Sequence, residues 1–443
     1  MASTFPIQAM LPRGKVILGP DVPVPEKGSP VIDLSTYQSV GDKKNSDYFE
    51  EYLPKIYKRR EAVGLEKIVD RMAAAVVQIE HGDGIKYLAE LAVMGPYRLV
   101  ELRINDTHRI YILESSPEFP RMIVLEPLSP TFEDEITRWN SMYPLARRKP
   151  NARFIGEIYY ADSISAVKEA LEPEYIRFVE PGDTENPFYH GPHLAFTFLS
   201  DYTYNRVGYI DIDFSDIERF DFGDRITLSA EEQGTLDRAA ALQEEHGISG
   251  LVLGIDHMAT RILAGDREHA ILEYLTMVPY YFWGAYNIME MNSSTNVTRH
   301  PNIDDDKKSP ARVFTANNTP SYVNSFDDLP MPTEDFVRNF GRRMHHIAVA
   351  VTDGHVADEK NVDYVVRNLA EMGAKFLAHV VGECKDDPNL KQIFSKSSEY
   401  SILITEYIER CHNYEGFFTR SNVAALTAAA GADERYVHGH VFD

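Results

Sequence analysis

Three strand-like stretches of the sequence each place one ionisable side chain in a row of apolar ones. Side chains of a β-strand alternate between two faces, so residues two positions apart share a face. A carboxylate in such a row is costly to bury unless something cationic meets it. The recurrence of this anomaly predicts one shared site rather than three separate core residues. The rows are Leu251, Leu253, Ile255 and His257; Met344, His346, Ala348 and Ala350; and Ile402, Ile404, Glu406 and Ile408.

Two histidines and one carboxylate form a ligand set for a metal ion. This set holds non-haem Fe(II) in oxygenases and leaves coordination positions open. His257, His346 and Glu406 are separated by 89 (346 − 257) and 60 (406 − 346) positions, so no local motif links them. The competing interpretation is a core histidine or an edge glutamate, which is commoner for any one of them alone. The adjacent His345 is expected on the opposite face of its strand, pointing away from the metal. The alternative is that strand twist brings His345 into contact with a ligand or the substrate.

The length and net charge of the chain limit the classes of protein to which it can belong. The chain has 443 residues, enough for about two to four core-forming units. Its net charge is −23, with 68 acidic and 45 basic residues and no basic stripe, which argues against nucleic acid and anionic membrane surfaces as partners. No apolar run approaches the ~20 residues that span a bilayer. We therefore expect a globular enzyme with no nucleic-acid or membrane partner.

The N-terminus and the cysteines favour a cytoplasmic location. The first residues lack the basic region and apolar core of a secretory signal. Cys384 and Cys411 form neither a Cys-x-x-Cys motif nor a disulfide framework. Both fit the reducing cytosol, where thiols stay free.

One order of elements recurs along the chain. Residues 152–223 are predicted to form a strand, a helix capped by Ser163 and three further strands. Similar units are expected at 250–326 and 344–410, and a less regular one at 46–125, in which 46–78 is helical and 86–93 a strand. Each unit exposes one apolar face of a curved sheet, and pairing two units closes a barrel-like cup. The predicted fold is α+β, with tandem βαβββ modules in two barrel-like halves.

This repeat divides the chain into three parts. Residues 1–40 are rich in proline and glycine and are expected to form an extended arm. Residues 41–245 form an N-terminal domain without a metal-ligand set, ending in a polar helix at 229–246 that opens with a capping-box-like sequence. Residues 246–443 form the catalytic domain, which an Ala-rich helix at 419–431 closes.

The candidate ligands and their surroundings resemble 4-hydroxyphenylpyruvate dioxygenase, a family of the vicinal oxygen chelate superfamily. His257 in Gly-Ile-Asp-His, His346 in His-His-Ile-Ala and Glu406 in Glu-Tyr-Ile-Glu-Arg match that family's three metal ligands. Gln392 in Gln-Ile-Phe-Ser matches its strand before the glutamate, and residues 410–422 resemble its C-terminal tail. Ser309 and Asn324 lie fifteen positions apart (324 − 309), as do its substrate-side serine and asparagine. The match covers the C-terminal half of the chain.

The resemblance implies Fe(II) held by the three ligands, with substrate and dioxygen meeting in the cup. Gln392, Ser309, Asn324 and Phe417 would lie on the substrate side. The reaction would be oxidative decarboxylation of an aromatic or related 2-oxo acid and hydroxylation of the same molecule, without separate 2-oxoglutarate. In the family, the helix matching 419–431 gates the cup, so this helix is expected to shift when substrate binds.

The chain departs from the family pattern at the end of the pocket away from the metal. His345 stands where the family has a glutamine, and Met331 where it has a second one. Val423 replaces the phenylalanine that follows the tail asparagine. In the family these glutamines help bind the phenol end of the substrate. The ligand end is retained and the distal pocket is altered, so a different substrate is expected.

Two other classes of function remain open at this stage. One is another metal-dependent vicinal oxygen chelate enzyme, such as an extradiol dioxygenase, an isomerase or a lyase. The other is a non-catalytic protein that binds a small molecule in the cup. The sequence also leaves the oligomeric state open, a homo-oligomer included.

Overall fold

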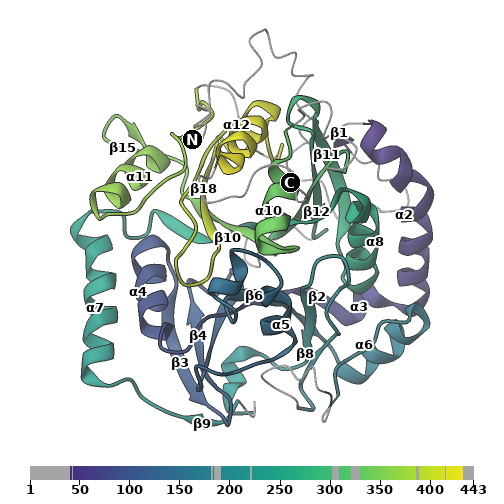
Figure 1. Ribbon diagram of the computed structural model, residues 1–443, viewed down its shortest axis with the longest axis horizontal. Coiled ribbons are helices and arrows are strands. Elements are labelled where there is room, and N and C mark those ends of the chain that lie inside the picture. The colour runs from purple at the N-terminus through teal and green to yellow at the C-terminus, as the bar shows by residue number, and fades with distance from the viewer. Residues whose placement is uncertain are drawn as a thin grey trace.

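The computed structural model describes residues 40–41, 43–180, 183, 191–219, 222–301, 309–320, 330–385, 389–414 and 416–432. Two eight-stranded mixed sheets form its two halves, which lie one above the other in Figure 1 with helices around them. The predicted arm at 1–40 lies almost wholly outside the described residues, as does Asn324. No helix among the described residues is long and apolar enough to cross a membrane.

The N-terminal half forms the lower sheet in Figure 1. Its strands are β2 (Val69–Gln78), β3 (Arg98–Ile104), β4 (His108–Glu114), β5 (Arg121–Pro127), β6 (Arg153–Ala161), β7 (Leu194–Phe196), β8 (Arg206–Ile210) and β9 (Asp224–Arg225). Its helices are α2 (Lys43–Val63), α3 (Leu65–Ile68), α4 (Gly84–Met94), α5 (Glu135–Ser141), α6 (Ile164–Leu171) and α7 (Ala230–Glu245), with 3₁₀ turns at Ala146–Arg148, Glu172–Glu174 and Phe214–Arg219.

The C-terminal half carries the second sheet. Its strands are β1 (Val40–Gly41), β10 (Val252–Arg261), β11 (Tyr281–Ile288), β12 (Ser293–Arg299), β13 (Ala311–Asn317), β14 (Arg343–Val351), β17 (Asn389–Phe394) and β18 (Ile404–Cys411), with β15 (His355–Val356) and β16 (Glu359–Lys360) as a separate pair. Its helices are α8 (Arg267–Met277), α10 (Pro332–Phe340), α11 (Asn361–Glu371) and α12 (Arg420–Gly431), with 3₁₀ turns at Ala264–Asp266 and Met289–Met291.

Both sheets have the same topology. Without the short edge strands β9 and β1, their orders are β3-β4-β5-β2-β6-β8-β7 and β11-β12-β13-β10-β14-β18-β17. The central pairs β2·β6 and β10·β14 are antiparallel, whereas β2·β5, β6·β8, β10·β13 and β14·β18 are parallel. The predicted α+β fold of tandem modules is thereby confirmed. In the second and fourth modules the strands predicted at 175–179 and 375–381 contribute only isolated bridges.

Two predicted elements of the first module are wrong. Residues 69–78 were expected to be helical, but they form β2, the central strand of the sheet. Most of β2 is buried, so the strand shows no alternation of apolar and polar residues. Residues 86–93 were expected to be a strand, but they lie in α4, whose leucine, alanine, glutamate and methionine residues are good helix formers. The polar strand β12 was not predicted; it is buried between β11 and β13.

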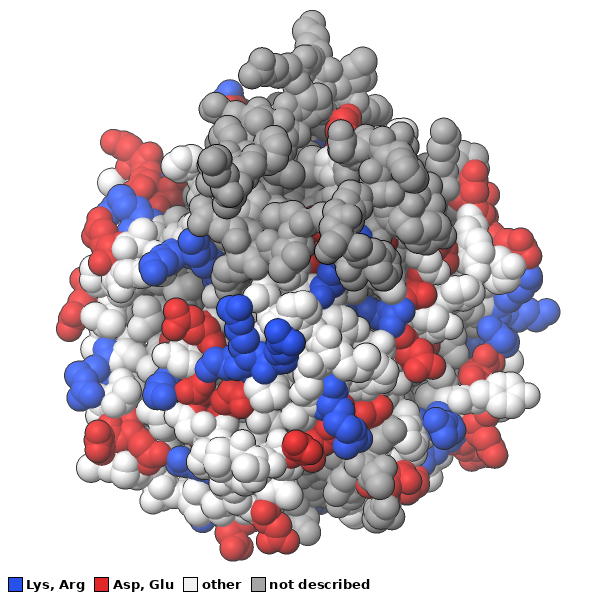
Figure 2. Space-filling view, in the orientation of Figure 1, with Lys and Arg blue, Asp and Glu red and all other residues white. Residues whose placement is uncertain are grey.

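The two halves share one core. A single cluster of buried side chains includes Met72 and Tyr209 from the first half and Met258 and Phe282 from the second. The connecting helix α7 begins with the predicted capping box, in which Ser229 and Glu232 each bind the other's backbone N–H. On the face shown in Figure 2, acidic and basic side chains are interspersed. The sheet of the second half, which carries the candidate ligands, therefore packs against the first half.

Candidate metal centre

Strand pairing brings the three candidate ligands together. β14 lies between β10 and β18, and Ala348 of β14 pairs with His257 on one side and with Glu406 on the other. His346 pairs with Ala259, two residues beyond His257. The three side chains therefore rise from one patch of three neighbouring strands. The small side chain of Ala348 leaves space between His257 and Glu406.

The ligand atoms converge in a buried site. Glu406 Oε2 lies 3.1 Å from His257 Nε2 and 3.2 Å from His346 Nε2. One ligand atom from each residue lies within 4.8 Å of the others, as a single metal ion requires. The other carboxylate oxygen, Glu406 Oε1, is buried without a hydrogen-bond partner. A buried carboxylate oxygen with no donor, beside two imidazole nitrogens, is the donor set that a divalent cation would satisfy.

The charge state of the histidines follows from their neighbours. Burial lowers the pKa of His257, but the carboxylates of Glu406 and Asp256 outweigh it and raise this pKa to about 9. Burial, with the charge of His257, lowers the pKa of His346 well below its usual range. One imidazole thus carries a proton beside Glu406. A bound cation would take the place of that proton, because metal ligation requires neutral imidazole.

Asp256 and Arg410 fix the orientation of His257. His257 Nδ1 lies 2.8 Å from Asp256 Oδ1, and Arg410 donates to both oxygens of Asp256, at 2.7 and 2.8 Å. Burial acts against ionisation of Asp256, but Arg410 and His257 hold its pKa well below the usual range. Since Asp256 stays ionised, it holds the proton on Nδ1 and directs Nε2 toward Glu406. Such outer partners orient the ligands of many metal sites.

A β-bulge brings His345 into the site. Met344 pairs with Thr260 and His346 with Ala259, so His345 is an extra residue in β14. Its ring lies beside that of His346, with the two Nδ1 atoms 2.8 Å apart, and it lines the cavity. The expectation that His345 points away from the site is wrong, because the bulge breaks the alternation of side chains. His345 does not belong to the three-residue ligand group.

The cavity beside the ligands is small, and α12 forms part of its lining. Its volume is about 50 Å³, whereas ligand pockets typically enclose roughly 300–1,000 Å³. Its lining mixes apolar and polar side chains, and β17 and α12 supply both kinds. The apolar side chains are Ala259, Val313, Phe394, Phe418, Val423 and Leu426, and the polar ones other than the ligands are Arg261, Thr295, Thr315, His345, Gln392 and Thr427.

The predicted substrate-side residues lie in different places. Gln392 lines the cavity, and its Oε1 is buried without a partner. Phe417 packs against the His257 ring, with centroids 5.6 Å apart, while its neighbour Phe418 lines the cavity. Ser309 does not line it, because its hydroxyl accepts from Met72 N at 3.0 Å and lies 2.7 Å from Tyr280 Oη, at the junction with the first half. Asn324 is outside the described residues.

Four residues of the site were not predicted from the sequence. They are Asp256, Arg261, Arg410 and Phe418. One signal was present: Arg410 follows Glu406 by four positions in a strand, so both share a face. Pairing of Arg410 with Asp256 could not be read from the sequence, since it depends on which strands are neighbours.

The first half has no ligand side chain at the equivalent positions. Matching the strand registers of the two sheets places Ala74, Gly156 and Gly208 where the second half has His257, His346 and Glu406. A Cβ atom on Gly156 would lie 2.1 Å from the carbonyl oxygen of Arg206, and one on Gly208 would lie 2.7 Å from the Phe196 ring. A side chain at position 156 would displace the backbone of the neighbouring strand, and one at position 208 would displace the Phe196 ring.

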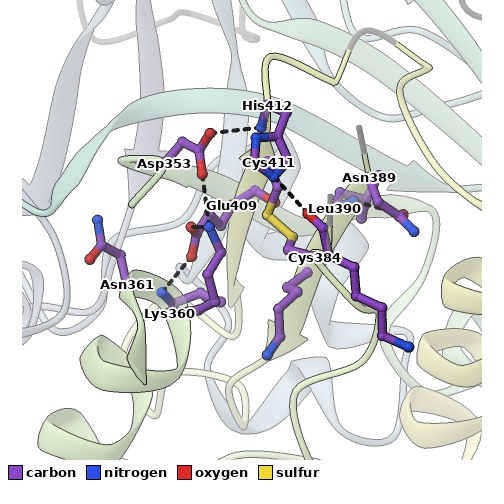
Figure 3. Close-up of a disulfide and its surroundings, with 12 residues drawn as sticks. Asp353, Lys360, Asn361, Cys384, Asn389, Leu390, Glu409, Cys411 and His412 are labelled. Carbon is purple, nitrogen blue, oxygen red and sulfur yellow. Dashed lines mark hydrogen bonds and ion pairs between the residues drawn. A yellow bond between two sulfur atoms is a disulfide. The ribbon is translucent and has the colours of Figure 1, made fainter. Parts of the chain in front are cut away.

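A second acidic group lies at the far end of β18 (Figure 3). Glu409 and Asp353 both bind Lys360 Nζ, at 2.8 and 2.9 Å, so this group already has its cation. Beside it, Cys384 and Cys411 form a disulfide with Cα atoms 5.8 Å apart. The expectation of two free thiols is therefore wrong, and the cysteines give no support to a cytoplasmic location. Their separation of 27 positions did not predict the disulfide, because the pairing of β17 with β18 brings the two cysteines together.

Comparison with known proteins supports the fold at low sequence identity. No protein-family model matches this sequence, and no curated protein matches it significantly. A triple mutant of 4-hydroxymandelate synthase from Streptomyces coelicolor matches 83% of this chain and 100% of its own, with 15% identity and a TM-score of 0.57. A xylose isomerase-like TIM barrel/4-hydroxyphenylpyruvate dioxygenase fusion protein matches 86% of this chain but 58% of its own, with 12% identity and a TM-score of 0.54. The chain has the fold of these proteins.

Proposed function

We propose that this chain is an Fe(II)-dependent dioxygenase that acts on an aromatic or related 2-oxo acid. The observation that carries the proposal is the buried group of His257, His346 and Glu406, in which Glu406 Oε1 has no hydrogen-bond partner. Two imidazoles and a carboxylate leave open positions on an octahedral ion. A bound Fe(II) would supply those positions for a chelating 2-oxo acid and dioxygen, and the electrons to activate dioxygen. The fold shared with 4-hydroxymandelate synthase supports this class of enzyme.

The chain's own residues would bind and orient the substrate. Phe394 and Phe418 offer aromatic faces, and Val423 and Leu426 add apolar side chains, which suits an aryl ring. Asp256 and Arg410 keep His257 Nε2 directed at the ligand group. Because the site is buried, water is excluded while the substrate reacts.

Two polar atoms of residues that line the cavity have no partner, and one is a donor and the other an acceptor. If His346 Nε2 presents its lone pair to a metal, its Nδ1 carries the proton and donates to His345 Nδ1. His345 Nε2 then carries a proton, and this nitrogen is buried without a partner. Gln392 Oε1 is an unpartnered acceptor in the same cavity. A hydroxyl on the far end of the substrate would satisfy both atoms, since it accepts one hydrogen bond and donates another.

The proposed reaction balances without a second organic substrate. The 2-oxo acid loses its carboxyl group as carbon dioxide, and one oxygen atom of dioxygen enters the new carboxylate. The other oxygen atom becomes a hydroxyl on the same molecule. The altered residues His345, Met331 and Val423 favour an aryl 2-oxo acid other than 4-hydroxyphenylpyruvate.

The test is gas exchange by anaerobically purified, Fe(II)-loaded protein with a panel of aryl 2-oxo acids. We expect equal amounts of dioxygen consumed and carbon dioxide released, without added 2-oxoglutarate. His257→Ala should lose bound iron and activity but remain folded, as judged by circular dichroism. Dioxygen uptake with catechols and no carbon dioxide would instead identify an extradiol dioxygenase. Turnover without dioxygen uptake would identify an isomerase or lyase, and binding without turnover a carrier.

A further inference from the structure

Two fully buried arginines link the halves of the molecule. Arg153 begins β6 and Arg343 begins β14, and matching the strand registers places them at equivalent positions of the two sheets. Each reaches across to the other strand's backbone. Arg153 Nη2 donates to the carbonyl oxygen of Arg342, and Arg343 Nη2 donates to that of Ala152 at 2.7 Å. Both side chains have zero solvent exposure.

Neither guanidinium meets a carboxylate. Among the described residues, Arg153 donates hydrogen bonds only to neutral oxygens, those of Arg342 and Asn140, the latter at 2.9 Å. The Arg153 guanidinium also lies 5.7 Å from the centroid of the Tyr204 ring. Three of the N–H nitrogens, Arg153 Nε and Arg343 Nε and Nη1, are buried without any acceptor. Arginine does not give up its proton in proteins, so two positive charges remain in the interior. An uncompensated buried charge is strongly destabilising.

A third buried arginine at the same junction has a carboxylate partner that offsets its charge. Arg312 is 1% exposed, and its Nε lies 2.7 Å from Glu157 Oε1 across the two halves. No such partner exists for Arg153 or Arg343 in the described part of the chain. Burial, together with the charge of Arg153, lowers the pKa of Arg343 well below its usual range. Each guanidinium bonds to the backbone beside the other arginine, so the two like charges lie near each other.

We propose that a small monovalent anion of chloride size binds between Arg153 and Arg343. It would accept hydrogen bonds from the three unpartnered nitrogens and offset the two charges. A large anion is disfavoured, because both side chains are enclosed. The protein has a net charge of −23, and charges of both signs are mixed on the face in Figure 2, so a general positive field does not gather anions. The anion would hold the start of β14, three residues before His346, against β6.

Thermal unfolding of the full chain tests the site. We compare chloride, bromide and gluconate at one ionic strength, because gluconate is too large to enter. Chloride and bromide should raise the unfolding temperature by a few degrees, since a ligand of the folded state stabilises it. Arg343→Met should abolish this dependence. The matched control Arg312→Met loses stability by stranding Glu157 but should keep the full response to chloride.

Bromide located by anomalous scattering in crystals gives a second measurement that does not depend on a variant folding. A bromide peak within hydrogen-bond distance of Arg343 Nη1 and Arg153 Nε supports the proposal. Water at that place, or equal unfolding temperatures in chloride and gluconate, would overturn it. None of these readouts uses catalytic activity, so the outcome is independent of the proposed dioxygenase function.

Discussion

At the scale of single residues, the ligand set depends on a chain of partners behind it. Arg410 donates to both oxygens of Asp256, and Asp256 holds His257 Nδ1. Arg410 also donates to the carbonyl oxygen of Phe417 at 2.7 Å. Phe417 has a positive φ of 61°, a backbone conformation that is uncommon outside glycine. The same arginine therefore orients a ligand and holds the segment that carries Phe418.

Asp256→Asn should weaken metal binding without unfolding the chain. The amide still occupies the space, but it loses the charge that fixes the tautomer of His257. We expect affinity for Fe(II) to fall by about 10–100-fold, measured by anaerobic titration. Arg367→Gln, which alters an exposed arginine paired with Glu359, is the control and should bind iron normally. Unchanged affinity in Asp256→Asn would show that His257 is held by its packing alone.

Gln392→Leu should reduce discrimination between substrates with and without a distal hydroxyl. The leucine keeps most of the side-chain volume but removes the acceptor Oε1. The ratio of kcat/KM for a hydroxylated over an unhydroxylated aryl 2-oxo acid should fall by about tenfold or more, because a buried polar group then lacks its partner. Iron content is the control, since Gln392 is not a ligand. An unchanged ratio would place the hydroxyl elsewhere.

At the scale of elements, α12 lines the cavity beside the ligands. α12 packs against α10, β11 and β17, and all its positions except Arg420, Ser421 and Ala425 are buried. Its alanines permit close packing against these neighbours. The cavity that it lines holds about 50 Å³, too little for an aryl 2-oxo acid. If the proposed substrate binds here, we expect this helix or the segment before it to move.

Deleting the residues after 415 tests α12 as a gate. The three ligands lie in the sheet and should still hold iron. Turnover should be lost, or dioxygen uptake should exceed product formation, because water enters an open site. The measurements are iron content and the ratio of dioxygen consumed to product. Full turnover with a ratio of one in the truncated protein would rule out gating by this helix.

Cys384→Ser should destabilise the chain through the loop that the disulfide closes. The bridge spans 27 residues, for which chain entropy predicts a loss of about 3–4 kcal/mol in the free energy of unfolding. Denaturant unfolding under oxidising conditions measures this loss. Wild-type protein in reductant should match the variant, and the variant itself should not respond to reductant. Equal stability of wild type and variant would mean that the bridge imposes no constraint on the unfolded chain.

At the scale of the whole molecule, the two halves depend on contacts between groups that are costly to bury. The pair of Glu157 and Arg312 is one such contact. A second contact between the halves packs α4 against residues 398–402. The ring centroids of Tyr87 and Tyr400 lie 6.5 Å apart there. Glu90 of α4 lies beside Ser398 in this junction. Burial, with a smaller contribution from Glu399, raises the pKa of Glu90 to about 7.

Glu90→Gln should flatten the dependence of stability on pH. The pKa of Glu90 is higher in the folded than in the unfolded chain, so its contribution is fully present below pH 4.5. It is lost as the pH rises from 4.5 to 7. The variant should therefore exceed wild type in unfolding free energy by about 3 kcal/mol at pH 8, by the linkage relation, and match it near pH 4. The measurement is denaturant unfolding at both values. An equal difference at both would assign the effect to packing.

Part of the fold and of the candidate site could be predicted from patterns of residues that lie close together in the sequence. Alternation and apolar rows identified His257, His346 and Glu406 as anomalous, and the repeated order of elements predicted the tandem modules. The capping sequences at Ser163 and Ser229 predicted where α6 and α7 begin. These features depend on residues close in sequence, whose spacing sets which face or turn they occupy.

The remaining features depend on register between strands that are far apart in the chain. One extra residue in β14 turns His345 into the cavity, and the meeting of β10 with β18 pairs Asp256 with Arg410. The disulfide and the hydrogen bond between Met72 and Ser309 also join residues that are far apart in the chain. Burial on both faces also removed the alternation that would have marked β2 as a strand. Only the tertiary structure decides such contacts, because a pairing shift of one residue reverses the face that every side chain occupies.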